Sequence, residues 1–236
     1  MPILRFPDPA LDQFSKAGAE AIERVNEQVL ERLAQVGLRL DAKEISLGSI
    51  QGAVGVGAAI VERDEIREIV MGTLGLADEF HKEEVKRGFR EAGRSLAIEV
   101  DLPDEALADF RTHLTDRFSD SIDEHLDFIE RVTIDGVKKG KRASDIANDF
   151  AERTDVAKDK MELLGRDTLG SLKSFQDQHR MQRLGVEQYR WLTAKDERVR
   201  TTHKILHGTV QRYDQPPLVG HPGEDYLCRC NAAPQI

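Results

Sequence analysis

The residues best suited to chemistry lie near the C-terminus, where the two cysteines of the chain are separated by one arginine. Cys228 and Cys230 can supply two thiolates to a soft metal ion, and zinc prefers tetrahedral sites built from cysteine and histidine. On an extended strand, residues two positions apart point to the same face, so both sulfurs could face one site. The alternative is a pair of ordinary buried thiols that hold the chain end in place.

Three histidines of the same segment, His203, His207 and His221, are candidate partners for these thiolates. His203 and His207 are four residues apart and would share one face of a helix. A zinc peptidase helix needs H-E-x-x-H, and Lys204 stands where the glutamate is required, so the spacing argues against peptidase chemistry. The position of His207, directly before a glycine, also fits the C-terminal end of a helix on electrostatic grounds alone.

Asp196, Arg198 and Arg200 precede the expected helix around His203. Asp196 is predicted to be the N-cap of that helix, and it is also a candidate oxygen donor to a metal or a nuclease acid or base. The four histidines outside this segment are scattered over predicted helices and are expected at the surface or its boundary; they are His81, His113, His125 and His179.

The composition describes a charge-rich protein that is long enough to bury a core, with 236 residues, 39% hydrophobic residues and 33% charged residues. The formal net charge is −9, which argues against a general nucleic-acid binder. From Glu187 onward, seven Lys/Arg stand against six Asp/Glu, so the acidic excess lies in the rest of the chain. No apolar run approaches the ~18 residues of a membrane span, and no secretory signal is visible. Two cysteines separated by one residue do not make a disulfide framework, so we expect synthesis in a reducing cytoplasm.

The elements before this segment are predicted to be helices. Apolar residues from Leu11 to Val36 recur every three or four positions, which predicts one long helix that starts at Asp8 and stops at Gly37. A second stripe runs from Leu107 to Ile129, after a boundary at Pro103. Between them, residues 64–97 are helical in pattern, whereas the glycine-rich segment 48–61 is expected to be a flexible loop or a tightly packed turn. This segment lacks the glycine and lysine spacing of a phosphate loop.

A basic run at 138–142 predicts a turn between helices, followed by a short helix capped by Ser144 and a longer one over 155–183 that ends near Gly185. Strands are predicted at 186–193, 209–213 and 226–230. The expected fold is mainly α, an elongated helical body with a small α+β C-terminal module. Its expected regions are an N-terminal helical region over 1–100, a helical region over 101–185 and the module over 186–236.

The tail resembles a known family of phage proteins. The tail contains the pattern W-x-T-x-x-D-x-R-V-R-x-x-H, followed by a glycine, a proline-rich loop and C-R-C. This pattern is similar to that of the phage Mu protein F-like family of minor head proteins, which are also called head-morphogenesis proteins. The resemblance covers about residues 144–236. The matching positions are Trp191, Thr193, Asp196, Arg198, Val199, Arg200, His203, Gly208, Pro216, Pro217, Pro222, Gly223, Cys228, Arg229 and Cys230.

The resemblance implies a structural, non-enzymatic protein of a tailed phage or prophage, with no catalytic residue. It implies a place in the virion head at the portal vertex, reached from the host cytoplasm during assembly, and a role in head assembly, DNA packaging or DNA ejection. The implied partners are the portal protein and the major capsid protein, with packaged DNA as a further candidate and no membrane. Most of the matching positions are expected to be structural, including Trp191, Asp196, Arg198, Arg200, Gly208 and Arg229.

The resemblance also bears on the metal site. Some relatives carry C-x-x-C where this chain has Arg200 and His203. A histidine can replace a cysteine at zinc, whereas Arg200 removes a ligand that His221 could supply. The hypothetical zinc site therefore consists of His203, Cys228, Cys230 and His221.

Two other functions stay open on the residues alone. One is a metal-dependent nuclease or hydrolase, or a toxin-like module, that uses the His/Cys cluster with Asp196 or Glu197 as base. The other is a zinc-dependent interaction module unrelated to phage.

Overall fold

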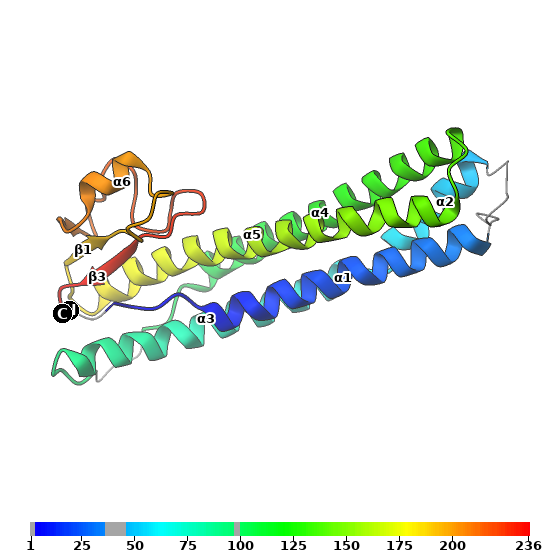
Figure 1. The fold of residues 1–236 in the computed structure, drawn as a ribbon. Coiled ribbons are helices and arrows are strands. Elements are labelled where there is room, and N and C mark those ends of the chain that lie inside the picture. The colour runs from blue at the N-terminus through cyan, green and yellow to red at the C-terminus, as the bar shows by residue number, and fades with distance from the viewer. Residues whose placement is uncertain (1–2, 36–45, 97–99) are drawn as a thin grey trace. The chain divides into compact units, whose positions relative to one another are not determined.

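Figure 1 shows the fold in a computed structural model, which describes residues 3–35, 46–96 and 100–236. The predicted fold class is confirmed: the chain is mainly helical, with a small three-stranded antiparallel sheet near the C-terminus. No helix of the described part is long and apolar enough to cross a membrane. The elements are, in chain order, α1 (Asp8–Gln35), α2 (Leu47–Ala58), α3 (Arg63–Glu91), α4 (Asp104–Lys138), α5 (Ala143–Arg183), β1 (Gln188–Leu192), α6 (Thr201–Leu206), β2 (Val210–Arg212) and β3 (Asn231–Pro234).

The chain forms two compact units, each assembled from separate stretches of sequence. Unit 1 consists of the described parts of Met1–Asp12, Met71–Thr112 and Gly165–Ile236, and unit 2 of those of Gln13–Val70 and His113–Leu164. The division into regions 1–100, 101–185 and 186–236 follows chain order and stays a prediction.

Helix α1 buries its predicted apolar stripe. In unit 2, its residues Phe14, Val25 and Val29 are fully buried, and the ring of Phe14 meets that of Phe118 edge-on at 5.5 Å between centroids. Burial of this stripe, rather than helix propensity alone, stabilises a helix of this length. The predicted start at Asp8 is confirmed, and the predicted stop at Gly37 lies outside the described residues.

The prediction of a loop for the glycine-rich segment 48–61 is wrong, because most of this segment forms α2. Ser46 caps the helix: its side chain accepts a hydrogen bond from the backbone N–H of Ser49 at 3.0 Å. A buried glycine brings the helix close to α1, since a Cβ atom on Gly57 would lie 2.4 Å from Cγ2 of Val29. Small residues here serve close helix packing.

Most other helix boundaries agree with the sequence. α3 ends at Glu91, two residues before Gly93 with φ +71°, and α4 starts directly after Pro103. The basic run 138–142 forms the turn between α4 and α5, as predicted, and α5 ends just before Gly185 with φ +75°.

The prediction of two helices after this turn is wrong, because α5 is continuous from Ala143 to Arg183. Ser144 lies inside its first turn rather than at the cap. No proline or glycine interrupts residues 143–164. Thr154, which stands where the two helices were expected to meet, donates its hydroxyl hydrogen to the Phe150 carbonyl at 2.9 Å.

Buried polar side chains join α3 to α5 in unit 1, so the prediction that His81 lies at the surface is wrong. Nε2 of His81 lies 2.8 Å from Oδ1 of Asp177, and Lys173 donates to the other carboxylate oxygen at 2.6 Å. Arg180 donates to Nδ1 of His81 at 2.9 Å and to Asp78 at 2.6 Å. Buried charges of this kind are tolerated because each has a partner of opposite sign.

A second buried histidine, His125, lies in unit 2 and also contradicts the surface prediction. Its Nε2 lies 2.8 Å from Oδ1 of Asn26, whose amide nitrogen donates to the hydroxyl of Thr154 at 2.7 Å. The other two histidines of that prediction, His113 and His179, are exposed and partly buried, respectively, as expected.

The sheet has the strand order β2-β1-β3, with both pairs antiparallel. β1 and β2 confirm the strands predicted at 186–193 and 209–213. The strand predicted at 226–230 is wrong, since the third strand begins only at Asn231. Leu227 has φ +50° and the backbone N–H of Cys228 donates to the carbonyl of Asp225, so the chain turns here instead of extending.

The core beneath the sheet belongs to unit 1 as a whole. It contains side chains from the N-terminal segment, α3, α5 and the sheet, namely Leu4, Val85, Phe89, Met181, Val186, Tyr189, Trp191, Tyr213, Cys230 and Ala232. The C-terminal module therefore shares its hydrophobic core with helices that precede it in sequence, which fixes the backbone that carries the candidate ligands.

Candidate metal centre

His203 is presented by α6, which follows the central strand β1. The helix starts after Arg200, whose backbone is extended, and ends at His207, which is its C-cap as the sequence suggested. Gly208 turns the chain back with φ +81°, and its N–H donates to the carbonyl of Trp191 at 2.8 Å. The ring of His203 is buried and meets the indole of Trp191 edge-on at 5.4 Å.

The two cysteines lie on the segment that leads into β3. A glycine with φ +99°, Gly223, lets this segment approach α5: a Cβ atom there would lie 2.7 Å from the carbonyl oxygen of Gly170. The carboxylate of Asp167, on the same helix, accepts the N–H of Leu227 at 2.6 Å. These contacts fix the backbone on the N-terminal side of Cys228, and pairing of β3 with β1 fixes it beyond Cys230.

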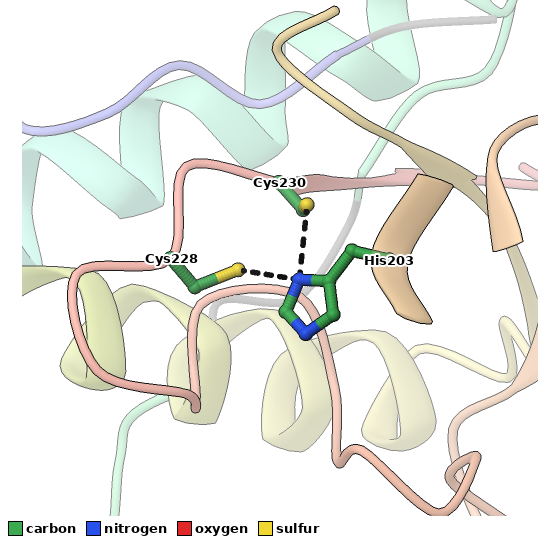
Figure 2. Close-up of side chains that lie close together, drawn as sticks. All are labelled: His203, Cys228 and Cys230. Carbon is green, nitrogen blue, oxygen red and sulfur yellow. Dashed lines mark hydrogen bonds between the residues drawn. The ribbon is translucent and has the colours of Figure 1, made fainter. Parts of the chain in front are cut away.

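The structure brings three of the predicted site residues together. Figure 2 shows the ring of His203 between the side chains of Cys228 and Cys230. Its Nδ1 lies 3.5 Å from each of the two sulfurs. All three candidate ligand atoms lie within 4.8 Å of one another. The sulfurs share one site as predicted, although the expected reason, a strand through both cysteines, is wrong.

The two thiols are electrostatically unequal. The pKa of Cys228 is lowered to about 5, first by a hydrogen bond from the Cys230 thiol and then by backbone N–H groups that include that of Gly223. The pKa of Cys230 is raised, because its thiol donates to Cys228 and because it is buried. The thiol of Cys228 is therefore the more acidic of the two, and both sulfurs face His203.

The other nitrogen of the His203 ring faces a carboxylate. Nε2 lies 3.4 Å from Oδ2 of Asp225, and this oxygen lies 3.2 Å from Nε of Arg200. Arg200 also donates to the carbonyl of Tyr226 at 2.7 Å. Arg200, which the resemblance treated as a lost ligand, therefore holds the loop and the carboxylate that face His203.

The structure does not bring His221 into this group. Its Nδ1 lies 2.9 Å from the hydroxyl of Tyr189, and its ring packs against Tyr213. Its backbone N–H donates to the carboxylate of Glu224 at 2.8 Å. His221 is therefore a buried member of the aromatic cluster under the sheet.

Asp196 is also outside the group, and its predicted role as N-cap of the His203 helix is wrong. Residues 197–199 form a turn, so the helix starts at Thr201. The carboxylate of Asp196 instead pairs with Arg229 at 2.7 Å and accepts the backbone N–H of Arg198 at 3.1 Å. The arginine between the two cysteines is thereby tied to the loop after β1, and Asp196 does not lie beside the thiols as a base.

Sequence reasoning missed Asp225 and the role of Arg200. The only signal was position, since Asp225 precedes Cys228 by three residues and Arg200 precedes His203 by three. Their meeting depends on the turn through Leu227, which the sequence did not predict.

Comparison with known proteins identifies the segment that carries this site. Residues 127–233 match a family model described as Phage Mu protein F like protein. An uncharacterized protein of Haemophilus influenzae is 28% identical over 114 residues, which are 48% of this chain and 26% of that protein. An uncharacterized protein of Methanocaldococcus jannaschii is 27% identical over 179 residues, which are 73% of this chain and 28% of that protein.

The chain spans 26% and 28% of the lengths of these two relatives. No solved structure matches it. The matched residues include β1, α6, β2, both cysteines and most of β3, so they contain the whole His/Cys group. Residues 127–233 therefore resemble the Phage Mu protein F like family of phage head-related proteins, which confirms the resemblance read from the sequence.

Proposed function

We propose that this chain is a structural, non-enzymatic minor head protein of a tailed phage or prophage. In this proposal it lies at the portal vertex or inner capsid face and aids head assembly, DNA packaging or DNA ejection. The observation that carries the proposal is the family match over residues 127–233.

The fold is consistent with a structural part. The sheet of unit 1 shares its core with α3, α5 and the N-terminal segment, where the backbone N–H of Arg5 donates to Glu84 at 2.9 Å and Arg87 donates to the carbonyl of Ile3 at 2.7 Å. The C-terminal sheet is therefore held in one compact unit with these helices, which suits a structural component that binds protein partners.

Charge supports protein partners over naked DNA. The net charge is −9, and phosphate binding requires a positive surface. We therefore propose the portal protein and the major capsid protein as direct partners, with any contact to packaged DNA made through them.

The test uses the phage or prophage that encodes the chain. Mass spectrometry of purified heads should detect the polypeptide in a few copies per particle, and cross-linking should join it to portal or major capsid protein. Deletion of the gene should yield heads that are misassembled, unfilled or unable to eject DNA, and expression of the wild-type chain should restore infectious particles. Purified heads without the polypeptide would contradict the proposal.

Incubation of the purified chain with nucleic acid and zinc, manganese or magnesium ions tests the alternative of a metal-dependent nuclease. We expect no cleavage above a metal-only control. Cleavage that His203→Ala abolishes and His207→Ala retains would replace the structural proposal with the enzymatic one.

A further inference from the structure

We propose that His203, Cys228 and Cys230 bind one zinc ion through Nδ1 and the two sulfurs, with Asp225 and Arg200 as the outer groups that orient the histidine. The test of this site does not depend on the proposed virion role, because the metal content is measured on the purified chain.

The separations fit a tetrahedral zinc site. Zinc lies about 2.0–2.1 Å from a histidine nitrogen and about 2.3 Å from a thiolate, so tetrahedral angles place the nitrogen and each sulfur roughly 3.5 Å apart. Both observed distances from Nδ1 of His203, to Cys228 and to Cys230, are 3.5 Å. The limit of 4.8 Å for the whole group also accommodates the roughly 3.8 Å expected between two sulfurs on one zinc ion.

Hydrogen bonds alone do not explain why both sulfurs lie close to the same nitrogen of His203. Nδ1 of His203 carries either one hydrogen or one lone pair, so it forms a good bond with one of the two sulfurs at a time. Both sulfurs nevertheless lie 3.5 Å from it, and Figure 2 shows both contacts converging on this one nitrogen. An ion between the three atoms engages all of them at once.

The charges also fit a divalent cation. Two thiolates and a neutral imidazole carry −2 in total, which a zinc ion cancels, so the site is neutral when it is filled. This matters because His203 and Cys230 are buried, and an uncompensated charge at that depth is costly.

The outer groups have the pattern found around zinc-bound histidines. A metal-ligating histidine usually donates its second ring N–H to a carboxylate, which fixes the tautomer and the orientation of the ring. Here Nε2 of His203 faces Asp225 at 3.4 Å, and Arg200 holds this carboxylate at 3.2 Å. His203 is therefore arranged to present Nδ1, rather than Nε2, to the sulfurs.

The described residues offer three ligands of the His, Cys, Asp and Glu types within this group, so the fourth position falls to water. His221 does not supply it, because its Nδ1 bonds to Tyr189. The ion would join α6 to the segment that enters β3 and would so lock the end of the chain onto the sheet.

The first experiment measures metal in the wild-type chain, purified under reducing conditions and without an affinity tag that binds metal. Elemental analysis should give close to one zinc per chain. Replacement by cobalt should give the thiolate charge-transfer band and the d–d bands of tetrahedral cobalt. X-ray absorption should place two sulfurs near about 2.3 Å from the zinc. These measurements need no variant, so they stand even where a substitution prevents folding.

Variants then identify the ligands. Cys228→Ser and His203→Gln should each lower the bound zinc to well below one per chain. Two matched histidine controls, His207→Gln at the C-cap of α6 and His221→Gln in the aromatic cluster, should retain one zinc. Loss of zinc in His221→Gln, with the fold preserved, would replace the proposed ligand set.

Asp225→Asn tests the outer group separately. It should weaken zinc binding by about 10- to 100-fold in competition with a chelator, while saturating zinc still gives one ion per chain and the cobalt spectrum keeps its form. Unchanged affinity would remove Asp225 from the proposal.

The metal proposal as a whole is overturned if the folded, reduced wild type is purified without metal and takes up neither zinc nor cobalt. A Cys228–Cys230 disulfide in the protein as isolated from cells without added oxidant would overturn it equally. Neither result bears on whether the chain is found in phage heads, so failure of this inference is distinguishable from failure of the proposed function.

Discussion

The guanidinium of Arg180 donates to Nδ1 of His81 across 2.9 Å, so the ring hydrogen of His81 lies on Nε2, where it faces Asp177. Burial lowers the pKa of His81, against the opposing effect of Asp177, and the ring is neutral. The buried carboxylate of Asp177 is then matched by Lys173 at 2.6 Å. These contacts fix the register of α3 against α5 beneath the sheet.

We predict that Asp177→Asn lowers the free energy of unfolding by about 3–5 kcal/mol, because it leaves the buried ammonium group of Lys173 without its counter-ion. The measurement is urea unfolding at neutral pH. The control is Glu79→Gln, which removes an exposed carboxylate that pairs with Lys82 and should change stability by less than about 1 kcal/mol. If the two substitutions changed the free energy of unfolding equally, the buried pair of Asp177 and Lys173 would stabilise the fold no more than an exposed pair does.

Because the pKa of His125 is lowered, we predict that the folded protein loses stability in mild acid. Burial, and then the nearby charge of Arg153, lower its pKa to about 4, and its Nδ1 has no hydrogen-bond partner among the described residues. Below pH 6.5 the unfolded chain takes up a proton at this position while the folded chain does not, so the stabilisation is complete above pH 6.5 and is lost as the pH falls towards 4. The loss is on the order of 3 kcal/mol.

The matched variant is His125→Gln, which keeps a donor for Asn26 and removes the titration. Its unfolding free energy should fall less than that of the wild type between pH 7 and pH 4. Parallel pH profiles for the two proteins would rule out His125 as the group that titrates.

Because the pKa of Glu84 is lowered, we predict a second loss of folding stability at lower pH. Burial alone would raise the pKa of this carboxyl, but hydrogen bonds from Arg87 and then Arg5 outweigh burial and lower it to about 2. Its stabilisation is therefore present above pH 4.5 and is lost as the pH falls towards 2.

At pH 7, Glu84→Gln should lower the unfolding free energy by roughly 1.5–3 kcal/mol, because it weakens hydrogen bonds to two charged groups. The difference between wild type and variant should narrow from pH 4.5 downwards in urea unfolding. Glu83→Gln, in an exposed pair with Lys86, should show no such narrowing. A constant difference for Glu84→Gln across this range would contradict the assigned pKa.

The helices could be predicted because each buries a periodic stripe. Phe14 to Leu33 of α1 and Leu114 to Ile129 of α4 follow helical spacing and are buried. The same reasoning failed where burial depends on a specific neighbour. The glycines of α2 suggested a loop, yet Gly57 is the point of contact with Val29. His81 looked like a surface residue because its partners, on α5, are 96 and 99 positions away.

The candidate site could be predicted in part for a related reason. The spacing of Cys228 and Cys230 is local, and His203 stood out because few other ligands are near. The group around them depends on a turn at Leu227, which has a positive φ that a leucine rarely adopts. That turn brings Asp225 to His203, and it is also why the strand starts at Asn231. His221 was assigned to the site because sequence distance cannot show that Tyr189 lies closer.

Two glycines of α2 give a matched pair of opposite predictions. Gly57→Ala would place Cβ 2.4 Å from Cγ2 of Val29 and 3.1 Å from Cδ2 of Leu126, both in the packed interior of unit 2. Val29 has little rotational freedom as a β-branched residue in a helix, so the helices must separate, and we predict destabilisation of about 1–3 kcal/mol. Gly52→Ala meets nothing within 4 Å and should stabilise the protein by up to about 1 kcal/mol, since alanine favours the helix. Urea unfolding of both variants measures the two effects, and stabilisation by both would mean that α2 does not pack closely on α1 at Gly57.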